Sequence, residues 1–161
     1  MNRLIEDRRI IVSGMDMAGI AFKENQAFGF GKVVAGIERE IEGSKAALVV
    51  LDSSSALELI VNDPAVYRRS MWALVANLRR LGVTSMLTSE IHSPDRDSLR
   101  FKHEHFIFDG MLVLYQGSKG ASRTQLLEVI KMRGHRHSFA TAPYKITPEG
   151  FAVQFGGSGQ I

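Results

Sequence analysis

The apolar and polar positions follow two different periods along the chain, and together they predict alternating strands and helices. Three short apolar runs have the length and the β-branched content of strands, at residues 9–13, 46–51 and 83–88. The middle run is apolar throughout, which is typical of a strand covered on both faces of a parallel sheet. Residues 14–31 contain four glycines and are expected to form a loop.

Helical spacing of apolar residues predicts two helices between these strands, over residues 32–42 and 63–81. Asp63 is suited to the N-cap of the second helix, and Pro64 to its first turn, where the missing N–H costs nothing. Gly82 is expected to end it. A strand, a helix and a second strand in this order form a crossover unit, so the sheet is expected to be at least partly parallel.

The second helix carries Trp72, the single tryptophan of the chain. This residue adjoins Met71 and lies one turn before Val75 and Ala76, which is the ordinary spacing of a buried face. We therefore expect the indole to lie near the edge of that face and to pack against the sheet.

Beyond residue 90 the pattern changes from alternating elements to successive strands. Residues 91–104 are polar and charged and predict a long loop, and residues 156–161 are expected to fray. Short turns at residues 109–110 and 148–150 favour antiparallel pairing in this third of the chain. The strand-like runs lie at residues 106–108, 111–115, 126–132, 144–147 and 151–155.

Composition limits the classes of protein that fit this pattern. The chain has 161 residues with 45% apolar content, which is enough for one globular domain, and its formal net charge is +3. It has no cysteine, which excludes disulfides, thiolate zinc sites and a cysteine nucleophile. No apolar run approaches the length of a membrane span, and the charged N-terminus does not resemble a signal peptide, so a cytoplasmic protein is expected.

Polar residues follow two of the predicted parallel strands at the points where the strands end. Asp52 and Ser53 follow the apolar strand, and the next strand ends in Thr88, Ser89 and Glu90. An apolar strand ending in Asp is the layout of a Walker B element, and open α/β sheets bind ligands at this edge. A polar strand end exposed to solvent explains the same residues.

Two basic residues close the longest strand-like run of the C-terminal third. Lys131 and Arg133 are two positions apart, so in a strand they project the same way, with Lys131 on the face of Leu127 and Val129, and could hold a phosphate. A solvated strand face explains them equally well. The two His-x-His sequences, at residues 103–105 and 135–137, are expected to be surface histidines, because no third metal ligand has a recognisable spacing.

A phosphate-binding loop is not recognisable within the sequence. Gly14 and Gly19 have the G-x-x-x-x-G spacing after a predicted strand. Ile20 and Ala21 stand where such a loop has Lys and Ser or Thr, and Asp16 would repel a phosphate. The glycine spacing is therefore interpreted as accidental.

Four stretches, taken in order, resemble the RecA superfamily and within it the KaiC/RadA-like ATPases. Residues 49–57, Val-Val-Leu-Asp-Ser-Ser-Ser-Ala-Leu, resemble the KaiC-type Walker B strand, and residues 78–90 resemble the next helix and the sensor strand. Residues 104–114 are similar to the family's Asp-Gly and apolar strand, and residues 129–150 look like its C-terminal signature. The resemblance is strongest over residues 40–155.

The resemblance implies a single domain over residues 1–161, an α/β fold with a three-layer RecA-like core. Its sheet would be mostly parallel, with antiparallel strands at the C-terminal end. Family members place a phosphate-binding loop, its helix and a pair of catalytic glutamates upstream of the region where this chain begins, so we expect an N-terminally incomplete domain. Residues 9–13 would keep the family's outer strand position beside the strand that ends at Asp52.

The resemblance also implies ATP and magnesium as ligands. Asp52 would hold the magnesium ion through water, with Ser53 beside the nucleotide, and Glu90 would be a sensor residue facing the phosphates. Lys131 and Arg133 would reach across a subunit interface to nucleotide bound by a neighbour, and so would serve both binding and catalysis.

Three functions are consistent with these features. The first is an ATP-binding KaiC-like module whose hydrolysis is lost or impaired. The second is a non-catalytic regulatory or assembly module, in a homo-oligomer or together with a complete KaiC-like homologue. The third is DNA binding, because RecA relatives hold DNA with the loop after the sensor strand. In this chain the charges of that loop nearly cancel, with Arg96, Arg100 and Lys102 against Asp95, Asp97 and Glu104.

Overall fold

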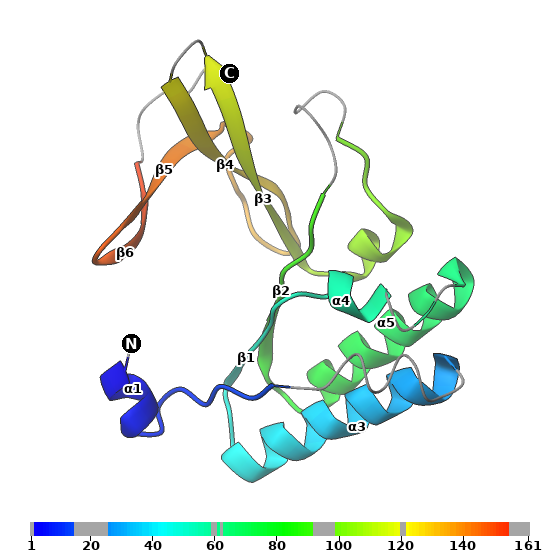
Figure 1. The fold of residues 1–161 in the computed structure, drawn as a ribbon. Coiled ribbons are helices and arrows are strands. Elements are labelled where there is room, and N and C mark those ends of the chain that lie inside the picture. The colour runs from blue at the N-terminus through cyan, green and yellow to red at the C-terminus, as the bar shows by residue number, and fades with distance from the viewer. Residues whose placement is uncertain are drawn as a thin grey trace. The chain divides into compact units, whose positions relative to one another are not determined.

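The computed structural model describes residues 2–14, 26–58, 61, 63–91, 99–119 and 122–154. The chain divides into two compact units, Met1–Glu90 and Ile91–Ile161. The first unit contains the α-helices and a parallel pair of strands, and the second contains a 3₁₀ helix and an antiparallel sheet (Figure 1). The expectation of a single domain over the whole chain stays a prediction.

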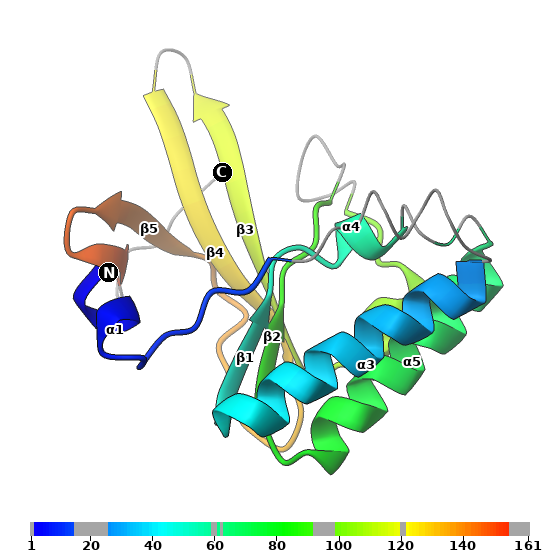
Figure 2. The same ribbon diagram turned by 60° about the horizontal axis from the view of Figure 1, so that its bottom comes forward.

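The first unit is built from four helices and two strands among its described residues. The long helices α3 (Gln26–Ser44) and α5 (Pro64–Arg80) lie side by side against the same side of the strands (Figure 2). The short helices are α1 (Asn2–Glu6) and α4 (Ser55–Glu58). In the described part of the chain, no helix is both long and apolar enough to cross a membrane.

The two strands of this unit, β1 (Leu48–Leu51) and β2 (Thr84–Leu87), pair in parallel, which confirms the predicted crossover. The expectation that β1 is buried on both faces is wrong. Leu48 and Val50 are 58% and 54% exposed, and Met86, the register partner of Val50, is 55% exposed. The reason is that α3 and α5 cover one face of the pair, and these three side chains alternate onto the other.

Helix α5 begins where its sequence predicts. The carboxylate of Asp63 accepts hydrogen bonds from the N–H groups of Ala65 (2.7 Å) and Val66 (3.0 Å), which would otherwise lack partners in the first turn. Gly82 follows the C-cap with φ +71°, a conformation that glycine adopts without strain. The buried stripe of the helix consists of Tyr67, Met71, Leu74, Val75 and Leu78.

The prediction for Trp72 is wrong, because its side chain is 64% exposed. Successive residues of a helix are rotated by 100°, so Trp72 lies on the outer face of α5 although it adjoins the buried Met71. The buried stripe is centred on Met71, Leu74 and Leu78 and does not include Trp72. Adjacency to a buried residue was therefore a poor guide to burial.

Two N-terminal expectations also fail. Helix α3 begins at Gln26, within the predicted loop, and continues through Gly31 and Gly43, where added Cβ atoms would meet nothing within 4 Å. Phe30 and Val33 are each 2% exposed and anchor this helix in the core, so burial outweighs the cost of its glycines.

Residues 9–13 do not form the predicted outer strand. The N–H groups of Arg9 and Ile10 both donate to the carbonyl of Leu4, at 2.9 and 3.0 Å, and so close the C-terminal end of α1. Arg8, with φ +53°, makes the turn that allows this. Among the described residues, β1 pairs with β2 alone.

The second unit contains a four-stranded antiparallel sheet in the order β3-β4-β5-β6, as the turn pattern predicts. Val113, Leu126 and Tyr144 are its buried apolar residues, and the rings of Tyr144 and Phe151 stack with centroids 4.7 Å apart. The strands are β3 (Gly110–Lys119), β4 (Ser122–Met132), β5 (Ala142–Thr147) and β6 (Gly150–Val153).

Two local features of this unit differ from the sequence pattern. Residues 103–107 form a 3₁₀ helix, η1 (His103–Ile107), where a strand over residues 106–108 was expected. In the long hairpin, Leu112 pairs with Val129 but Met111 pairs with Lys131, so the register shifts by one residue. Because of this β-bulge, Lys131 lies on the opposite face of β4 from Val129, and the expectation that they share a face is wrong.

Candidate functional site

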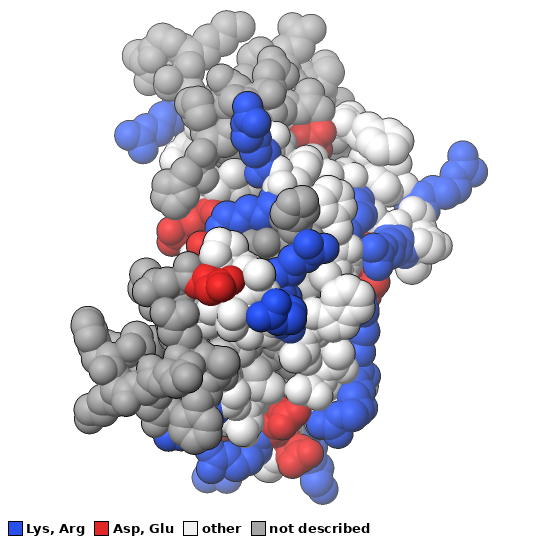
Figure 3. All heavy atoms as spheres, turned by 90° about the vertical axis from the view of Figure 1, so that its right-hand side faces the viewer, with Lys and Arg blue, Asp and Glu red and all other residues white. Residues whose placement is uncertain are grey.

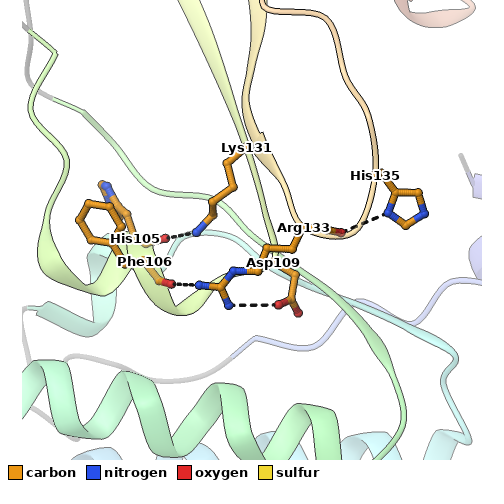
Figure 4. Close-up of polar contacts among 6 residues, drawn as sticks. All are labelled: His105, Phe106, Asp109, Lys131, Arg133 and His135. Atoms are coloured by element: carbon orange, nitrogen blue, oxygen red, sulfur yellow. Dashed lines mark hydrogen bonds and ion pairs between the residues drawn. The ribbon is translucent and has the colours of Figure 1, made fainter.

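The predicted site residues fall into two polar clusters, one in each unit. The Asp52 cluster contains Asp52, Ser54, Ser55, Thr88 and Glu90, and follows the carboxyl ends of β1 and β2. The basic cluster contains His105, Phe106, Asp109, Lys131 and Arg133, and joins β4 to η1 (Figure 4).

The two parallel strands bring Asp52 and Thr88 together, as expected for strand ends at one edge of a sheet. The hydroxyl of Thr88 donates to Oδ1 of Asp52 at 2.6 Å, and the Thr88 N–H donates to the carbonyl of Leu51 at 3.1 Å. Both side chains are exposed. The carboxylate is therefore held in one orientation while it stays accessible to solvent.

The turn after β1 extends this cluster toward Glu90. Ser54 is 5% exposed, and both its N–H and its hydroxyl donate to the carbonyl of Thr88, each at 2.8 Å. The hydroxyl of Ser55 accepts a hydrogen bond of 3.0 Å from the N–H of Glu90. Ser53 is half-buried, and the Asp52–Ser53 peptide bond is cis. Ser54 and Ser55 thus connect the end of β2 to the turn after β1.

In the basic cluster, both cations donate to carbonyls at the end of η1. Lys131 Nζ lies 3.2 Å from the carbonyl oxygen of His105, and Arg133 Nη2 lies 2.8 Å from that of Phe106 (Figure 4). The Lys131 ammonium also lies 5.9 Å from the centroid of the Phe106 ring. Carbonyls at a helix end lack partners within the helix, so the two cations satisfy them.

Arg133 makes three further contacts that fix its position. Its Nη1 lies 3.5 Å from Oδ1 of Asp109, and its N–H donates to the carbonyl of Asp109 at 2.8 Å. Its own carbonyl lies 3.2 Å from Nδ1 of His135. The side chains of Arg133 and Asp109 are 55% and 63% exposed, so their ion pair is solvated and weak.

The environment of Lys131 shifts its protonation equilibrium. Burial lowers the pKa of Lys131 below its ordinary value, and the charge of Arg133 lowers it further, while Asp109 opposes the shift. The amine therefore retains its proton less tightly than a solvent-exposed lysine does.

Sequence reasoning anticipated part of these clusters. It placed Thr88 and Glu90 at the same sheet edge as Asp52, and the bond from Thr88 to Asp52 confirms that juxtaposition. It did not identify Ser54, because a buried serine within a run of three leaves no signal in the sequence. It also missed that Lys131 and Arg133 bind backbone carbonyls, since carbonyl acceptors have no sequence signature. The roles assigned to the site residues stay predictions.

A metal site built from the His-x-His sequences finds no support in the described part of the chain. There, no three His, Cys, Asp or Glu residues group closely enough to hold an ion. The ring nitrogens of His137 are buried without a hydrogen-bond partner, and its ring lies 5.0 Å from that of Phe139.

Comparison with known families identifies the chain. The model of the family described as "ATPase: KaiC" matches residues 2–157. The chain belongs to the KaiC ATPase family. This assignment agrees with the KaiC resemblance of the four stretches at residues 49–57, 78–90, 104–114 and 129–150.

Curated relatives of the KaiC family match most of this chain. The circadian clock oscillator protein KaiC 1 of Synechocystis is 28% identical over 160 residues, which are 95% of this chain and 30% of that protein. The KaiC of Rippkaea orientalis is 32% identical over 127 residues, which are 79% of this chain and 24% of that protein. The chain thus spans less than a third of the length of these relatives.

A solved structure supports the KaiC-like fold. The crystal structure of a KaiC-like protein from Pyrococcus horikoshii aligns with a TM-score of 0.74 and 24% identity, over 95% of this chain and 63% of the other. The fold is therefore α/β of the KaiC-like RecA type, with a parallel pair of strands followed by an antiparallel sheet.

Proposed function

We propose that this chain provides the Walker B side of a KaiC-type site for ATP and magnesium, and that as an isolated chain it has lost or impaired hydrolysis. The observation that carries the proposal is the exposed carboxylate of Asp52, at the end of a parallel strand and held by the hydroxyl of Thr88 at 2.6 Å. Open α/β sheets bind ligands at the carboxyl ends of their strands, which is where this carboxylate lies.

The residues present fit a hydrated magnesium ion. Thr88 occupies one position on Oδ1 of Asp52, and a carboxylate offers about four lone-pair sites on its two oxygens, so acceptor capacity remains. Magnesium prefers oxygen ligands and retains several waters, which suits a carboxylate that faces solvent. When bound with ATP, the ion would neutralise phosphate charge.

The other residues of the Asp52 cluster would position the site. Ser54 and Ser55 tie the two strand ends together, so Glu90 is kept at a fixed place relative to Asp52. We assign Ser53 to the nucleotide side and Glu90 to a sensor role. These assignments rest on the KaiC resemblance and are supported by the shared sheet edge.

Hydrolysis requires more than a magnesium carboxylate. Phosphoryl transfer depends on a cradle of backbone N–H groups and a lysine around the phosphates. The one G-x-x-x-x-G spacing that follows a predicted strand, at residues 14–19, is followed by Ile20 and Ala21 in place of Lys and Ser or Thr. We therefore propose nucleotide binding without turnover by this chain alone.

A titration of the full chain with a fluorescent ATP analogue and magnesium tests this proposal. We expect a dissociation constant tighter than about 1 mM, which is roughly 4 kcal/mol of binding free energy. Asp52→Asn should weaken magnesium-dependent binding about tenfold, and Asp7→Asn, at an exposed carboxylate outside the cluster, should not. No binding would reject the ATP module and favour the regulatory or assembly role. Turnover that vanishes in Asp52→Ala would reject the loss of hydrolysis.

The basic cluster supports a second role, in which Lys131 and Arg133 act on nucleotide held by a neighbouring KaiC-like subunit. The half-exposed guanidinium of Arg133, held by a weak ion pair, could exchange a carbonyl for a phosphate. Cations supplied from a neighbour stabilise the charge that develops during phosphoryl transfer.

Mixing the chain with a complete KaiC-like homologue tests this second role. The partner's ATPase rate should change, and Lys131→Ala with Arg133→Ala should abolish the change. Arg123→Ala with Lys145→Ala removes the same charge from exposed positions and should not. Asp109→Ala loosens the ion pair but keeps both cations, so the change in rate should persist. If the variant with both Lys131→Ala and Arg133→Ala changes the partner's ATPase rate as much as the parent chain does, these cations are excluded from the mechanism.

A further inference from the structure

The outer face of α5 combines the exposed tryptophan with four exposed arginines. Trp72 is 64% exposed, and every arginine of the helix is exposed as well. At 100° per residue, these five side chains fall within an arc of about 120°. They form the outer face of α5, which consists of Arg68, Arg69, Trp72, Arg79 and Arg80.

The arginines form two pairs with the tryptophan between them. Arg68 and Arg69 precede Trp72 by one turn, and Arg79 and Arg80 follow it by two. At 1.5 Å per residue, the two pairs lie about 16 Å apart along the helix. The N-cap at Asp63 and the buried stripe on the opposite side hold the helix in place, so this spacing is fixed.

The face carries net positive charge. No Asp or Glu occurs in α5, and carboxylates outside the helix border the face. Glu38 of α3 pairs with Arg80 at 3.2 Å, and Asp63 lies close enough to Arg69 to be influenced by its charge. Figure 3 shows Lys and Arg side chains spread over one side of the molecule, with Asp and Glu side chains among them. Charge complementarity therefore calls for an anionic partner.

The apolar content of the face distinguishes between two kinds of anionic partner. Trp72 is the one large exposed apolar residue of α5, and its neighbours on the face, Ala65 and Ala76, are small and exposed. A protein interface needs a cluster of apolar anchors sealed from water, which a single indole does not provide. A nucleobase needs only one accessible aromatic face, because every base can stack.

We infer that the outer face of α5 binds single-stranded nucleic acid, with a base stacked on Trp72 and phosphates on the two arginine pairs. Guanidinium groups bind phosphate oxygens in a bidentate manner, and an indole stacks on bases with little sequence preference. None of the five residues of this surface belongs to the segment 91–104, and binding to the surface does not depend on nucleotide binding at Asp52.

The single tryptophan makes the test direct, because its fluorescence reports on this face alone. Titrating the full chain with a 20-nucleotide oligothymidylate at low salt should quench the emission, and anisotropy of a labelled oligonucleotide should give the same dissociation constant. Trp72→Ala should weaken binding between about 5-fold and 150-fold, as expected for one lost stacking contact, without changing the salt dependence.

The arginines are tested by salt dependence. Arg68→Ala with Arg69→Ala should weaken binding at least tenfold and lower the slope of log K against log salt by about 1.4, at about 0.7 per lost phosphate contact. Arg39→Ala with Arg123→Ala removes two exposed arginines from other elements and should leave the slope unchanged. Far-UV circular dichroism of each variant checks that helix content is retained.

Three results would overturn the inference. The first is that the oligothymidylate neither quenches Trp72 nor binds. The second is that the α5 double variant and the control double variant bind equally well. The third is that poly-L-glutamate quenches Trp72 and displaces the oligonucleotide at equal charge, which would identify the face as a docking site for an acidic protein segment.

Discussion

At the scale of single residues, Asp63 shows how one side chain defines where an element begins. Its carboxylate accepts two backbone hydrogen bonds in the first turn of α5, and these bonds hold the pKa of Asp63 below its usual range, with Val66 contributing most. The charged form is favoured because both donors, like the positive end of the helix dipole, prefer an anion. Helix stability is therefore linked to the ionisation of this residue.

The linkage predicts a pH-dependent effect of Asp63→Ala. At pH 7 the variant should melt a few degrees below the parent chain, because two N–H groups lose their acceptor. A depressed carboxyl pKa stabilises the fold fully above the unfolded pKa of about 3.9, and this stability is lost as the pH falls through the folded value. The gap in melting temperature should therefore shrink below about pH 4.

Asp63→Asn is the matched control, because its amide oxygen caps the helix without titrating. Its melting temperature should exceed that of Asp63→Ala by an amount that does not vary between pH 7 and pH 3. A gap between the parent chain and Asp63→Ala that widens on acidification would contradict the assigned role of the carboxylate.

At the scale of elements, η1 depends on residues distant in sequence. The carbonyls of His105 and Phe106 accept hydrogen bonds from Lys131 of β4 and from Arg133 just beyond it, more than twenty residues further along the chain. A short 3₁₀ helix has few hydrogen bonds of its own, so these two donors contribute a large share of its stability. The 3₁₀ conformation of residues 103–107 is thus a consequence of tertiary structure.

Removing one donor should loosen this helix. Arg133→Ala should speed amide exchange at His105, whose N–H donates to the carbonyl of Lys102, by about 2-fold to 5-fold. This corresponds to about 0.5–1 kcal/mol, a charge-assisted bond discounted for the exposure of Arg133. Arg123→Ala, at an exposed position of β4, should leave the rate unchanged. Equal effects of the two variants would show that Arg133 does not support η1.

The same contrast explains which elements could be predicted from the sequence. The ends of α5 and the β5–β6 hairpin were predicted because their signals are local, namely Asp63 with Pro64, Gly82, and the turn at residues 148–150. Residues 9–13 have strand composition, yet their first two N–H groups bond to Leu4, and composition does not specify a partner.

The candidate site likewise has features that could be predicted from the sequence and features that depend on tertiary structure. Asp52 and Glu90 were predicted because parallel strands bring their ends to one edge, a rule of topology that needs no coordinates. The orientation of Lys131 was not predicted correctly, because it depends on the register shift between Met111 and Leu112, which arises from the pairing of two strands. The alternation of apolar and polar residues along one strand does not show whether that strand has an extra residue opposite its partner strand.

At the scale of the whole molecule, the chain exposes apolar surface on strands of both units. Leu48, Val50 and Met86 share the uncovered face of the β1–β2 pair, and Leu112 and Leu114 share the exposed face of β3. Contiguous apolar patches are uncommon on monomeric proteins, whereas single exposed apolar residues are ordinary. The first patch is contiguous because its members are neighbours in the parallel register.

We predict that the folded chain binds the dye anilinonaphthalene sulfonate, and that Val50→Thr with Met86→Thr lowers the dye fluorescence. The reason is that these substitutions interrupt a continuous patch on two paired strands. Ile146→Thr, at a residue that is 75% exposed on β5, should change the signal little. Equal losses in the two variants would show that the dye reports total apolar exposure and not the patch.

The bulge in the β3–β4 hairpin determines which changes in chain length this protein can accept. Ile130 is the extra residue, since its neighbours Val129 and Lys131 pair with the consecutive residues Leu112 and Met111. Deleting Ile130 would restore a regular ladder and leave Lys131 on the same side of the sheet. Deleting Leu127 would instead turn either Leu126 or Glu128, both buried, toward solvent. Relatives whose β4 is one residue shorter or longer are therefore expected to differ at position 130. A deletion there keeps Lys131 on the same side of the sheet, so the position of its amine is preserved.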